Sequence, residues 1–143
     1  MQKRIIGRVD KVDLPLFDLQ DIEAKIDTGA NRSAIHCSKI EVLNKDGTEE
    51  LNFHIPLDSS KGSNVFQSRD FFLKRIKSSN GHIEERYIIK TIVILFGKRI
   101  KASFSLTDRA EMNYPILLGR RLLKSRFIVD VEEQYLSFKA KKD

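Results

Sequence analysis

The amino-acid sequence predicts an all-β fold, a small closed barrel or sandwich with one short helix near the C-terminus. Three observations lead to this prediction. Apolar residues recur at every second position in several segments, which is the spacing of half-buried strands. Turn-forming residues separate those segments, and one stretch alone has the character of a helix.

Two strands are predicted from clean alternation in the first half of the chain. Ile22, Ala24 and Ile26 alternate with charged residues. The apolar series 51, 53, 55 (Leu, Phe, Ile) alternates with Asn52 and His54. A similar pattern over residues 135–138 predicts another strand near the C-terminus. Each of these strands would turn one face towards a core and the other towards water.

Turn signals fall at residues 44–47, 78–81 and 96–99, each of which contains a glycine. The pair Asn80-Gly81 is favoured in the two-residue turn that joins antiparallel strands. It predicts a long hairpin made from residues 71–78 and 83–95. Residues 119–124 have room for one or two helical turns after the apolar run Ile116-Leu117-Leu118.

The composition predicts one domain covering residues 1–143. The chain has 41% hydrophobic residues and 12 aromatic ones, nine Phe and three Tyr, which excludes an intrinsically disordered chain. The polar stretch 56–64 is interpreted as a loop, because strand patterns resume on both sides of it. No apolar run exceeds five residues, so no membrane segment is predicted. A single cysteine, Cys37, fits a reducing compartment, and we expect a cytoplasmic protein without a signal peptide.

The segment that carries chemistry runs from Ala24 to Ala34 and contains Asp27-Thr28-Gly29. An acidic residue stands where a strand gives way to a glycine-containing turn. Backbone N–H groups and the Thr28 hydroxyl could hold the Asp27 carboxylate, and Gly29 lets another backbone approach closely. The structural alternative for such a tripeptide is an ordinary turn in which the aspartate bonds its own backbone.

Taken together, Asp27-Thr28-Gly29-Ala30 after an apolar strand and the late segment 114–120 (Tyr-Pro-Ile-Leu-Leu-Gly-Arg) resemble the retropepsin-like aspartic peptidases. Further matches at residues 6–8, 27–36, 78–81, 106–109 and 116–122 resemble a bacterial branch labelled ATP-dependent zinc protease, found near ATP-grasp glutamate ligases. The resemblance covers nearly the whole chain. It implies a retropepsin-type barrel, a peptide or protein substrate and a functional link to such a ligase.

Aspartic peptidase chemistry needs two carboxylates that share a proton, and this chain has one Asp-Thr-Gly. The resemblance therefore implies a two-fold homodimer in which Asp27 of each subunit is catalytic. In the family's plan Thr28 makes a cross-subunit hydrogen bond, while Gly29 and Ala30 face the substrate backbone. Asn80 and Gly81 would lie at the tip of a substrate-covering flap, and Arg120 would be structural.

Metal and nucleotide motifs are missing from the sequence, and we predict no cofactor. No His-Glu-x-x-His occurs, and the three histidines are spread over residues 36, 54 and 82. A zinc site assembled from His36, Cys37 and an acid stays open as the weaker alternative. We expect His36 to be a hydrogen-bonding partner of the Asp27 loop, and Cys37 to be buried rather than nucleophilic. No phosphate-binding loop is present, so any ATP dependence would belong to a partner.

Basic residues are concentrated between residues 97 and 126, which contain eight Lys and Arg but only two acidic residues. The resulting surplus of positive charge equals the +6 of the whole chain. This segment is either a solvated face or a surface for an acidic partner such as a poly-glutamate tail; a nucleic-acid partner is not favoured. A second function therefore stands beside the peptidase. It is a non-catalytic barrel that docks an acidic or ribosomal partner through its basic face.

Overall fold

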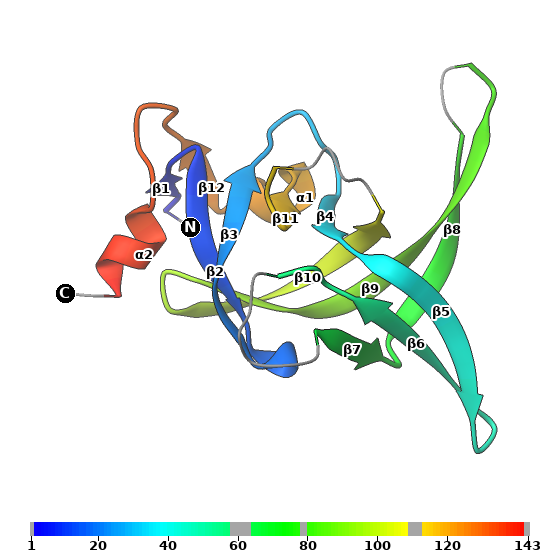
Figure 1. Cartoon of the computed structure of the whole chain (residues 1–143). Helices are drawn as coiled ribbons and strands as arrows, with labels where there is room; N and C mark the ends of the chain where they lie inside the picture. The colour runs from blue at the N-terminus through cyan, green and yellow to red at the C-terminus, as the bar shows by residue number, and fades with distance from the viewer. Residues whose placement is uncertain (1, 58–63, 78–79, 109–112, 142–143) are drawn as a thin grey trace.

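The computed structural model describes residues 2–57, 64–77, 80–108 and 113–141. Strands dominate these residues and the helices are short, so the predicted all-β fold is confirmed. Most of the polar loop 56–64, the start of the turn 78–81, and Arg109 lie outside the described residues. The elements, shown in Figure 1, are β1 (Arg4–Ile6), β2 (Val9–Leu14), the 3₁₀ turn η1 (Pro15–Phe17), β3 (Leu19–Ile26), β4 (Ser33–His36), β5 (Ser38–Lys45), β6 (Thr48–His54), β7 (Val65–Ser68), β8 (Phe71–Lys77), β9 (Ile83–Leu95), β10 (Lys98–Thr107), β11 (Ile116–Leu118), α1 (Arg120–Leu123), β12 (Phe127–Val129) and α2 (Leu136–Ala140).

A closed barrel forms the centre of the molecule. Its strands follow the order β10, β4, β11, β3, β2, β9, and pairing between β9 and β10 closes the ring. Most of these pairings are antiparallel, while β11 lies parallel to β3 and β10 lies parallel to β4. Closure removes the exposed edges that an open sheet would present. The barrel predicted from sequence is therefore present.

Inward-facing apolar side chains of the barrel strands make the core. Ala24, Ile35, Ile89, Phe104 and Leu118 are all fully buried. The two-residue period of β3 is the one read from the sequence, since Ala24 and Ile26 are buried and Lys25 is exposed. This alternation continues to the last residue of β3, and Asp27 comes directly after it.

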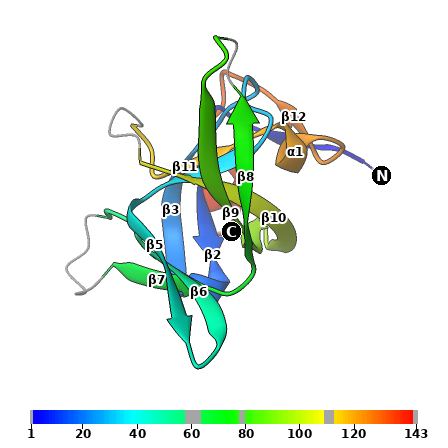
Figure 2. The same cartoon turned by 90° about the vertical axis from the view of Figure 1, so that its right-hand side faces the viewer.

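One hairpin and two smaller sheets extend the barrel. The predicted long hairpin is confirmed, because β8 pairs antiparallel with β9 over the length of β8. Strands β5, β6 and β7 form a separate three-stranded sheet, and Figure 2 shows it at the opposite end of the molecule from β12. Residues Asp46 and Gly47 join β5 to β6 with positive φ angles of 53° and 81°, as a tight hairpin turn requires. Strands β1 and β12 pair in parallel as a two-stranded sheet.

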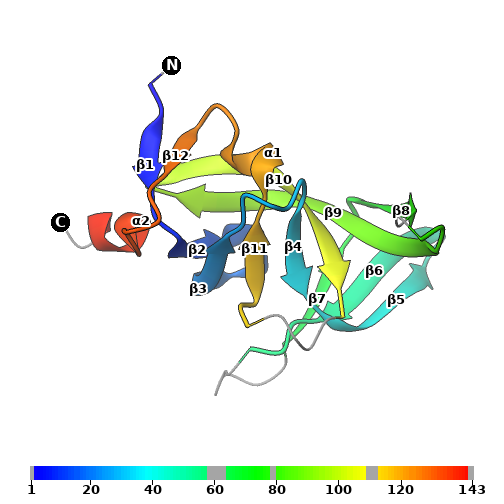
Figure 3. The same ribbon diagram turned by 90° about the horizontal axis from the view of Figure 1, so that it is seen from above.

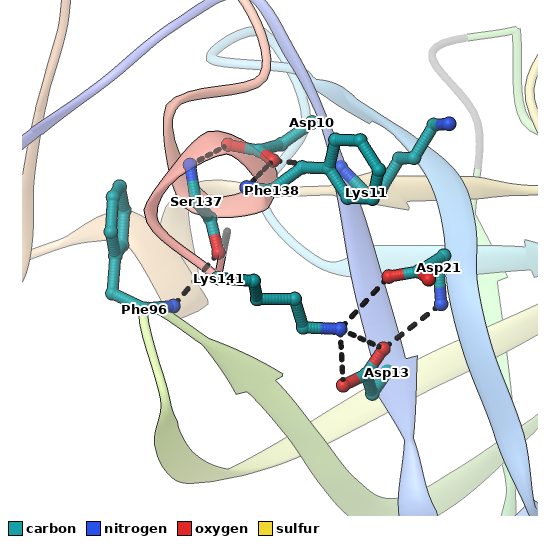
Figure 4. A network of polar contacts seen from close by, with 8 residues as sticks. All are labelled: Asp10, Lys11, Asp13, Asp21, Phe96, Ser137, Phe138 and Lys141. Carbon is teal, nitrogen blue, oxygen red and sulfur yellow. Dashed lines mark hydrogen bonds and ion pairs between the residues drawn. The ribbon is translucent and has the colours of Figure 1, made fainter. Parts of the chain in front are cut away.

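The strand predicted over residues 135–138 is wrong, because these residues begin helix α2. The buried carboxylate of Asp10, on β2, accepts hydrogen bonds from the backbone N–H groups of Ser137 at 2.9 Å and Phe138 at 3.1 Å. These are the donors that the first turn of a helix leaves without partners. Figure 4 shows this cap and the Lys141 ammonium between Asp13 and Asp21. A carboxylate from β2 therefore stabilises helix in a segment whose local pattern indicates strand.

The short helix predicted over residues 119–124 is confirmed as α1. Its inner residues Leu122 and Leu123 are buried against the core. None of the helices in the described ranges has the length and apolar character of a membrane-spanning segment.

Candidate active site

Asp27 comes directly after β3 and is held on two sides. Its backbone N–H donates to the carbonyl oxygen of Leu118 at 2.9 Å, which continues the parallel pairing of β3 with β11. Its carboxylate Oδ1 accepts the backbone N–H of Gly29 at 3.0 Å. The side chain is half-buried, while Thr28 and Gly29 are exposed. A carboxylate thus stands at the surface in a fixed orientation, with its other oxygen available to a partner or a water molecule.

The loop that carries Asp27 is fastened to the start of α1. The carbonyl oxygen of Ala30 accepts the N–H of Arg120 at 2.8 Å, and that of Asn31 accepts the N–H of Arg121 at 3.0 Å. The N–H of Gly119 donates to the hydroxyl of Ser33 at 3.0 Å. These bonds use the N–H groups that the first turn of a helix cannot satisfy internally. The segment after β11 therefore positions the segment after β3.

Gly119 is required here by close approach. A Cβ at this position would lie 2.8 Å from the carbonyl carbon of Arg32 and 2.9 Å from the carbonyl oxygen of Ala30. Both atoms belong to the backbone of the Asp27 loop, so neither can rotate away. The late glycine noted in the sequence is thus explained by direct packing of two backbones.

Arg120 has the structural role expected of it, because its Nη1 donates to the carbonyl oxygen of Thr28 at 3.1 Å. Arg32 was not singled out by the sequence, although it lies four residues after Thr28. Its Nη1 donates to the Ser103 hydroxyl at 2.8 Å, which joins the Asp27 loop to β10. Burial, and then the neighbouring Arg121 charge, lower the pKa of Arg32. No motif or spacing in the sequence indicated this contact.

A cationic cavity of about 730 Å³ adjoins the Asp27 loop. Thr28 and Asn31 line it from the loop, and four basic residues line it with them: Lys3, Arg120, Arg121 and Lys124. Three of these four belong to the basic segment 97–126. The cavity is large enough for several residues of a peptide, and its charge favours an acidic one.

Of the remaining predicted site residues, Ala30 lies in the Asp27 loop, and Asn80 and Gly81 lie elsewhere in the fold. Ala30 is half-buried in the Asp27 loop. Asn80 and Gly81 are exposed at the turn between β8 and β9, where Asn80 Oδ1 accepts the N–H of His82 at 3.2 Å. Figure 1 shows the β8–β9 hairpin rising on the same side of the molecule as the loop between β3 and β4, but apart from it. Within one subunit the described residues of the hairpin therefore do not lie over the loop between β3 and β4.

The histidines and the cysteine occupy separate places. His36 lies at the end of β4 away from the Asp27 loop, and its Nδ1 is 3.3 Å from the carbonyl oxygen of Thr107. His54 Nδ1 lies 3.4 Å from the Ser38 hydroxyl, and His82 is exposed. Cys37 is fully buried, and burial raises the pKa of its thiol well above the usual range. Among the residues that the structure describes, no three His, Cys, Asp or Glu side chains gather as metal ligands would.

The fold and the site define a class of protein. A closed barrel in which a strand ends in Asp-Thr-Gly, braced by a late strand, a glycine and a short helix, is the retropepsin-like architecture expected above. Residues 5–140 match the model of the RimB-like family, described as the retropepsin-like aspartic endopeptidase RimB. The chain belongs to this family.

Curated relatives of the chain carry a different name. A probable alpha-L-glutamate ligase from Shewanella halifaxensis is 33% identical over 135 residues, which are 93% of this chain and 30% of that protein. Another, from Desulfotalea psychrophila, is 34% identical over 130 residues, 90% of this chain and 28% of that protein. The chain therefore spans less than a third of the length of these relatives.

A solved structure has the same fold. The crystal structure of a protein of unknown function from Legionella pneumophila is 26% identical and superposes with a TM-score of 0.76. The match covers 95% of this chain and 99% of that one. The arrangement of strands described above is thus shared along almost the whole length of both chains.

Proposed function

We propose that this protein is an aspartic endopeptidase that acts as a homodimer, with one Asp27 from each subunit in the catalytic pair. The observation that carries the proposal is the Asp27 carboxylate itself. It is half-buried at the end of a barrel strand, held through one oxygen by the Gly29 N–H, and placed in a loop that is braced from outside. Membership of a family described as aspartic endopeptidases supports it.

The chemistry follows from bringing two such carboxylates together. At a separation of about 3 Å they cannot both be ionised, so they share one proton. The ionised group takes a proton from a water molecule that attacks the scissile carbonyl carbon, and the protonated group donates to the carbonyl oxygen. Because the chain supplies one Asp-Thr-Gly, the second carboxylate comes from the two-fold-related copy.

The surrounding residues have roles in the same proposal. Thr28 is exposed beside Asp27 and would bond across the subunit interface, while Gly29 and Ala30 would face the backbone of the substrate. Asn80 and Gly81, at the tip of the β8–β9 hairpin, would cover the bound peptide as a flap. Such a flap must bend towards Asp27 or reach the site in the dimer, because the hairpin stands apart from the loop (Figure 1).

The proposed substrate is a peptide or protein segment rich in acidic residues. The cavity beside Thr28 is lined by four cations, and the curated relatives are named as probable glutamate ligases. A functional link to a ligase of the ATP-grasp class and a cytoplasmic location complete the proposal.

The Asp27→Asn variant tests this function. It keeps nearly the same shape but removes the titratable pair, so cleavage of a diverse peptide library should fall at least about 100-fold, the scale of general acid–base catalysis. Asp46→Asn is the matched control, because Asp46 is an exposed carboxylate in a turn that tolerates Asn-Gly. Circular dichroism and gel filtration check that both variants fold and assemble alike. Cleavage that survives Asp27→Asn but is abolished by a chelator would show a metal mechanism instead.

A non-catalytic docking module is the second candidate, favoured by the same cationic cavity. It predicts that no peptide is cleaved at any pH and that an acidic peptide still binds. Binding should then weaken steeply with salt, since exposed charges are screened over about 10 Å at 0.1 M. In that case an Arg121→Glu, Lys124→Glu variant should lose binding while Asp27→Asn keeps it.

A further inference from the structure

A second cationic pocket lies between the β9–β10 turn and the sheet formed by β1 and β12, which Figure 3 shows side by side. Its volume is about 510 Å³, within the range of small-molecule sites. Its lining includes no residue of the Asp27 loop, but it shares Phe127 with the cavity beside Thr28. The two cavities therefore adjoin at Phe127, and none of the cations of this pocket lines the other one. Five basic residues line it: Arg4, Lys98, Arg99, Lys101 and Arg126. No Asp or Glu is among the described residues of its lining.

These cations lack an acidic partner among the described residues. Within the ranges that the structure describes, none of the five forms an ion pair with Asp or Glu. Arg126 instead donates a hydrogen bond of 3.0 Å from Nη1 to the carbonyl oxygen of Leu122. Like charges gathered in a concave site repel one another, and low-dielectric walls strengthen the field inside. The pocket is therefore suited to an anion that carries more than one negative charge.

The pocket also has an aromatic wall. The rings of Phe96 and Phe127 are 6.0 Å apart between centroids and tilted by 35°, and the Arg4 guanidinium lies 3.9 Å from the Phe96 centroid. Phe96 occupies the first position of a two-residue hairpin turn at φ 51°, a backbone conformation that a bulky residue rarely adopts. The Ser137 hydroxyl accepts the Phe96 N–H at 2.8 Å and holds the turn. Flat π-surfaces are thus fixed next to the cations.

We propose that this pocket binds a phosphorylated aromatic small molecule, the chemistry of a nucleotide. The phosphate oxygens would accept hydrogen bonds from the guanidinium and ammonium groups, which suit phosphate geometry. A planar base would stack on the Phe127 ring or on the outer face of the Arg4 guanidinium. An acidic peptide would neutralise the cations but would leave the aromatic wall without a partner.

Calorimetric titration of the whole chain with ADP as the probe tests the proposal, alongside adenosine, pyrophosphate and hexaglutamate. We expect ADP to bind at least about tenfold more tightly than adenosine or pyrophosphate, because it uses both walls. A Lys98→Glu, Arg99→Glu variant should weaken ADP binding at least about tenfold, since both residues are exposed and their replacement removes two phosphate contacts. Phe127→Leu should weaken ADP and leave pyrophosphate unchanged.

Lys74→Glu on β8 is the control, because Lys74 is exposed and lies outside the pocket; it should bind ADP like the parent. Thermal unfolding shows whether each variant is folded. Three results would overturn the proposal: ADP binding that is no tighter than pyrophosphate binding, ADP binding unchanged in the Lys98→Glu, Arg99→Glu variant, or hexaglutamate binding as tight as ADP. The last would make the pocket a docking site for acidic peptides.

Discussion

The Cys37 thiol is an example of a group whose chemistry is decided by its position. It lies in the core next to His36, and burial, followed by the charge of Asp108, raises its pKa above the usual range. Adjacent residues on extended backbone point to opposite faces, so the two side chains do not form a nucleophile and base. A neutral buried thiol is a packing residue.

This shift in the pKa of Cys37 predicts an alkaline loss of stability. In the unfolded chain a thiol has a pKa of about 8.5, so the unfolded state releases its proton above that pH while the folded state keeps it. The contribution of the protonated Cys37 thiol to the free energy of unfolding is fully present below about pH 8.5. Above that pH it falls by up to about 1.4 kcal/mol per pH unit. Urea unfolding between pH 7 and 10 should show a steeper decline for the parent than for Cys37→Ala. Parallel declines would contradict this account.

Gly119 is the residue whose change most directly disturbs the candidate site from outside it. Its replacement by Ala would push a Cβ against the backbone of Ala30 and Arg32 and shift the Asp27 loop. We expect a loss of about 1–3 kcal/mol of stability from overpacking, and a loss of proteolytic turnover approaching 100-fold from displacement of the carboxylate.

The control for Gly119→Ala is Gly47→Ala in the β5–β6 turn. A Cβ there meets open space, but the positive φ of 81° costs an alanine about 1 kcal/mol. This variant should lose comparable stability in urea unfolding and keep its turnover. Equal turnover in the two variants would mean that the packing at Gly119 does not position Asp27.

The sequence predicts hairpins and turns between neighbouring strands better than it predicts pairings between strands that are far apart in the chain. The β8–β9 hairpin and the β5–β6 turn follow from β-rich segments and from turn residues that are neighbours in the chain. The alternation predicted for residues 51–55 is not seen in burial, because Asn52 is buried together with Leu51 and Phe53. The insertion of β11 between β3 and β4 has no local signal, because it depends on pairing across about ninety residues. The position of Arg32 against Ser103 is likewise set by the closed barrel.

Helix α2 shows why a local pattern can mislead. Its apolar alternation fits a strand, but Asp10 caps its first turn, Ser137 bonds the Phe96 N–H, and Lys141 reaches Asp13 and Asp21. All of these partners lie far away in sequence, so no window of neighbouring residues could reveal them. Tertiary contacts override weak local preference in a helix this short.

Removal of the Asp10 carboxylate tests that explanation. Asp10 is fully buried and accepts three backbone N–H groups, those of Lys11, Ser137 and Phe138. Asp10→Ala leaves these donors without a partner, and we expect at least about 2 kcal/mol of destabilisation in urea unfolding. Hydrogen exchange should show faster opening of residues 136–140.

The control is Glu41→Ala, which removes an exposed carboxylate on β5 and should change the free energy of unfolding by no more than about 0.5 kcal/mol. Equal effects of the two changes would show that the cap does not hold α2.

For the whole molecule, the barrel and the family are the parts that the sequence predicted well. Both depend on Asp27-Thr28-Gly29 and the late segment 116–122, which the structure places side by side. A single domain over residues 1–143 stays a prediction. So do the catalytic roles of Asp27, Thr28 and Gly29 and the substrate contacts of Ala30, Asn80 and Gly81. The pocket with Arg4 and Phe127 was invisible in the sequence, because its walls come from both ends of the chain and from the β9–β10 turn.

In the proposed enzyme, two copies of the chain bring their Asp27 carboxylates together. A crystal structure of the dimer at moderately acidic pH measures this directly, as the distance between the nearest Asp27 oxygens of the two subunits. We predict a two-fold axis between the loops that follow β3 and a separation of about 3 Å, at which the carboxylates share a proton. A dimer with these carboxylates on separate faces, or a chain that stays monomeric in solution and in the crystal, would contradict the proposal.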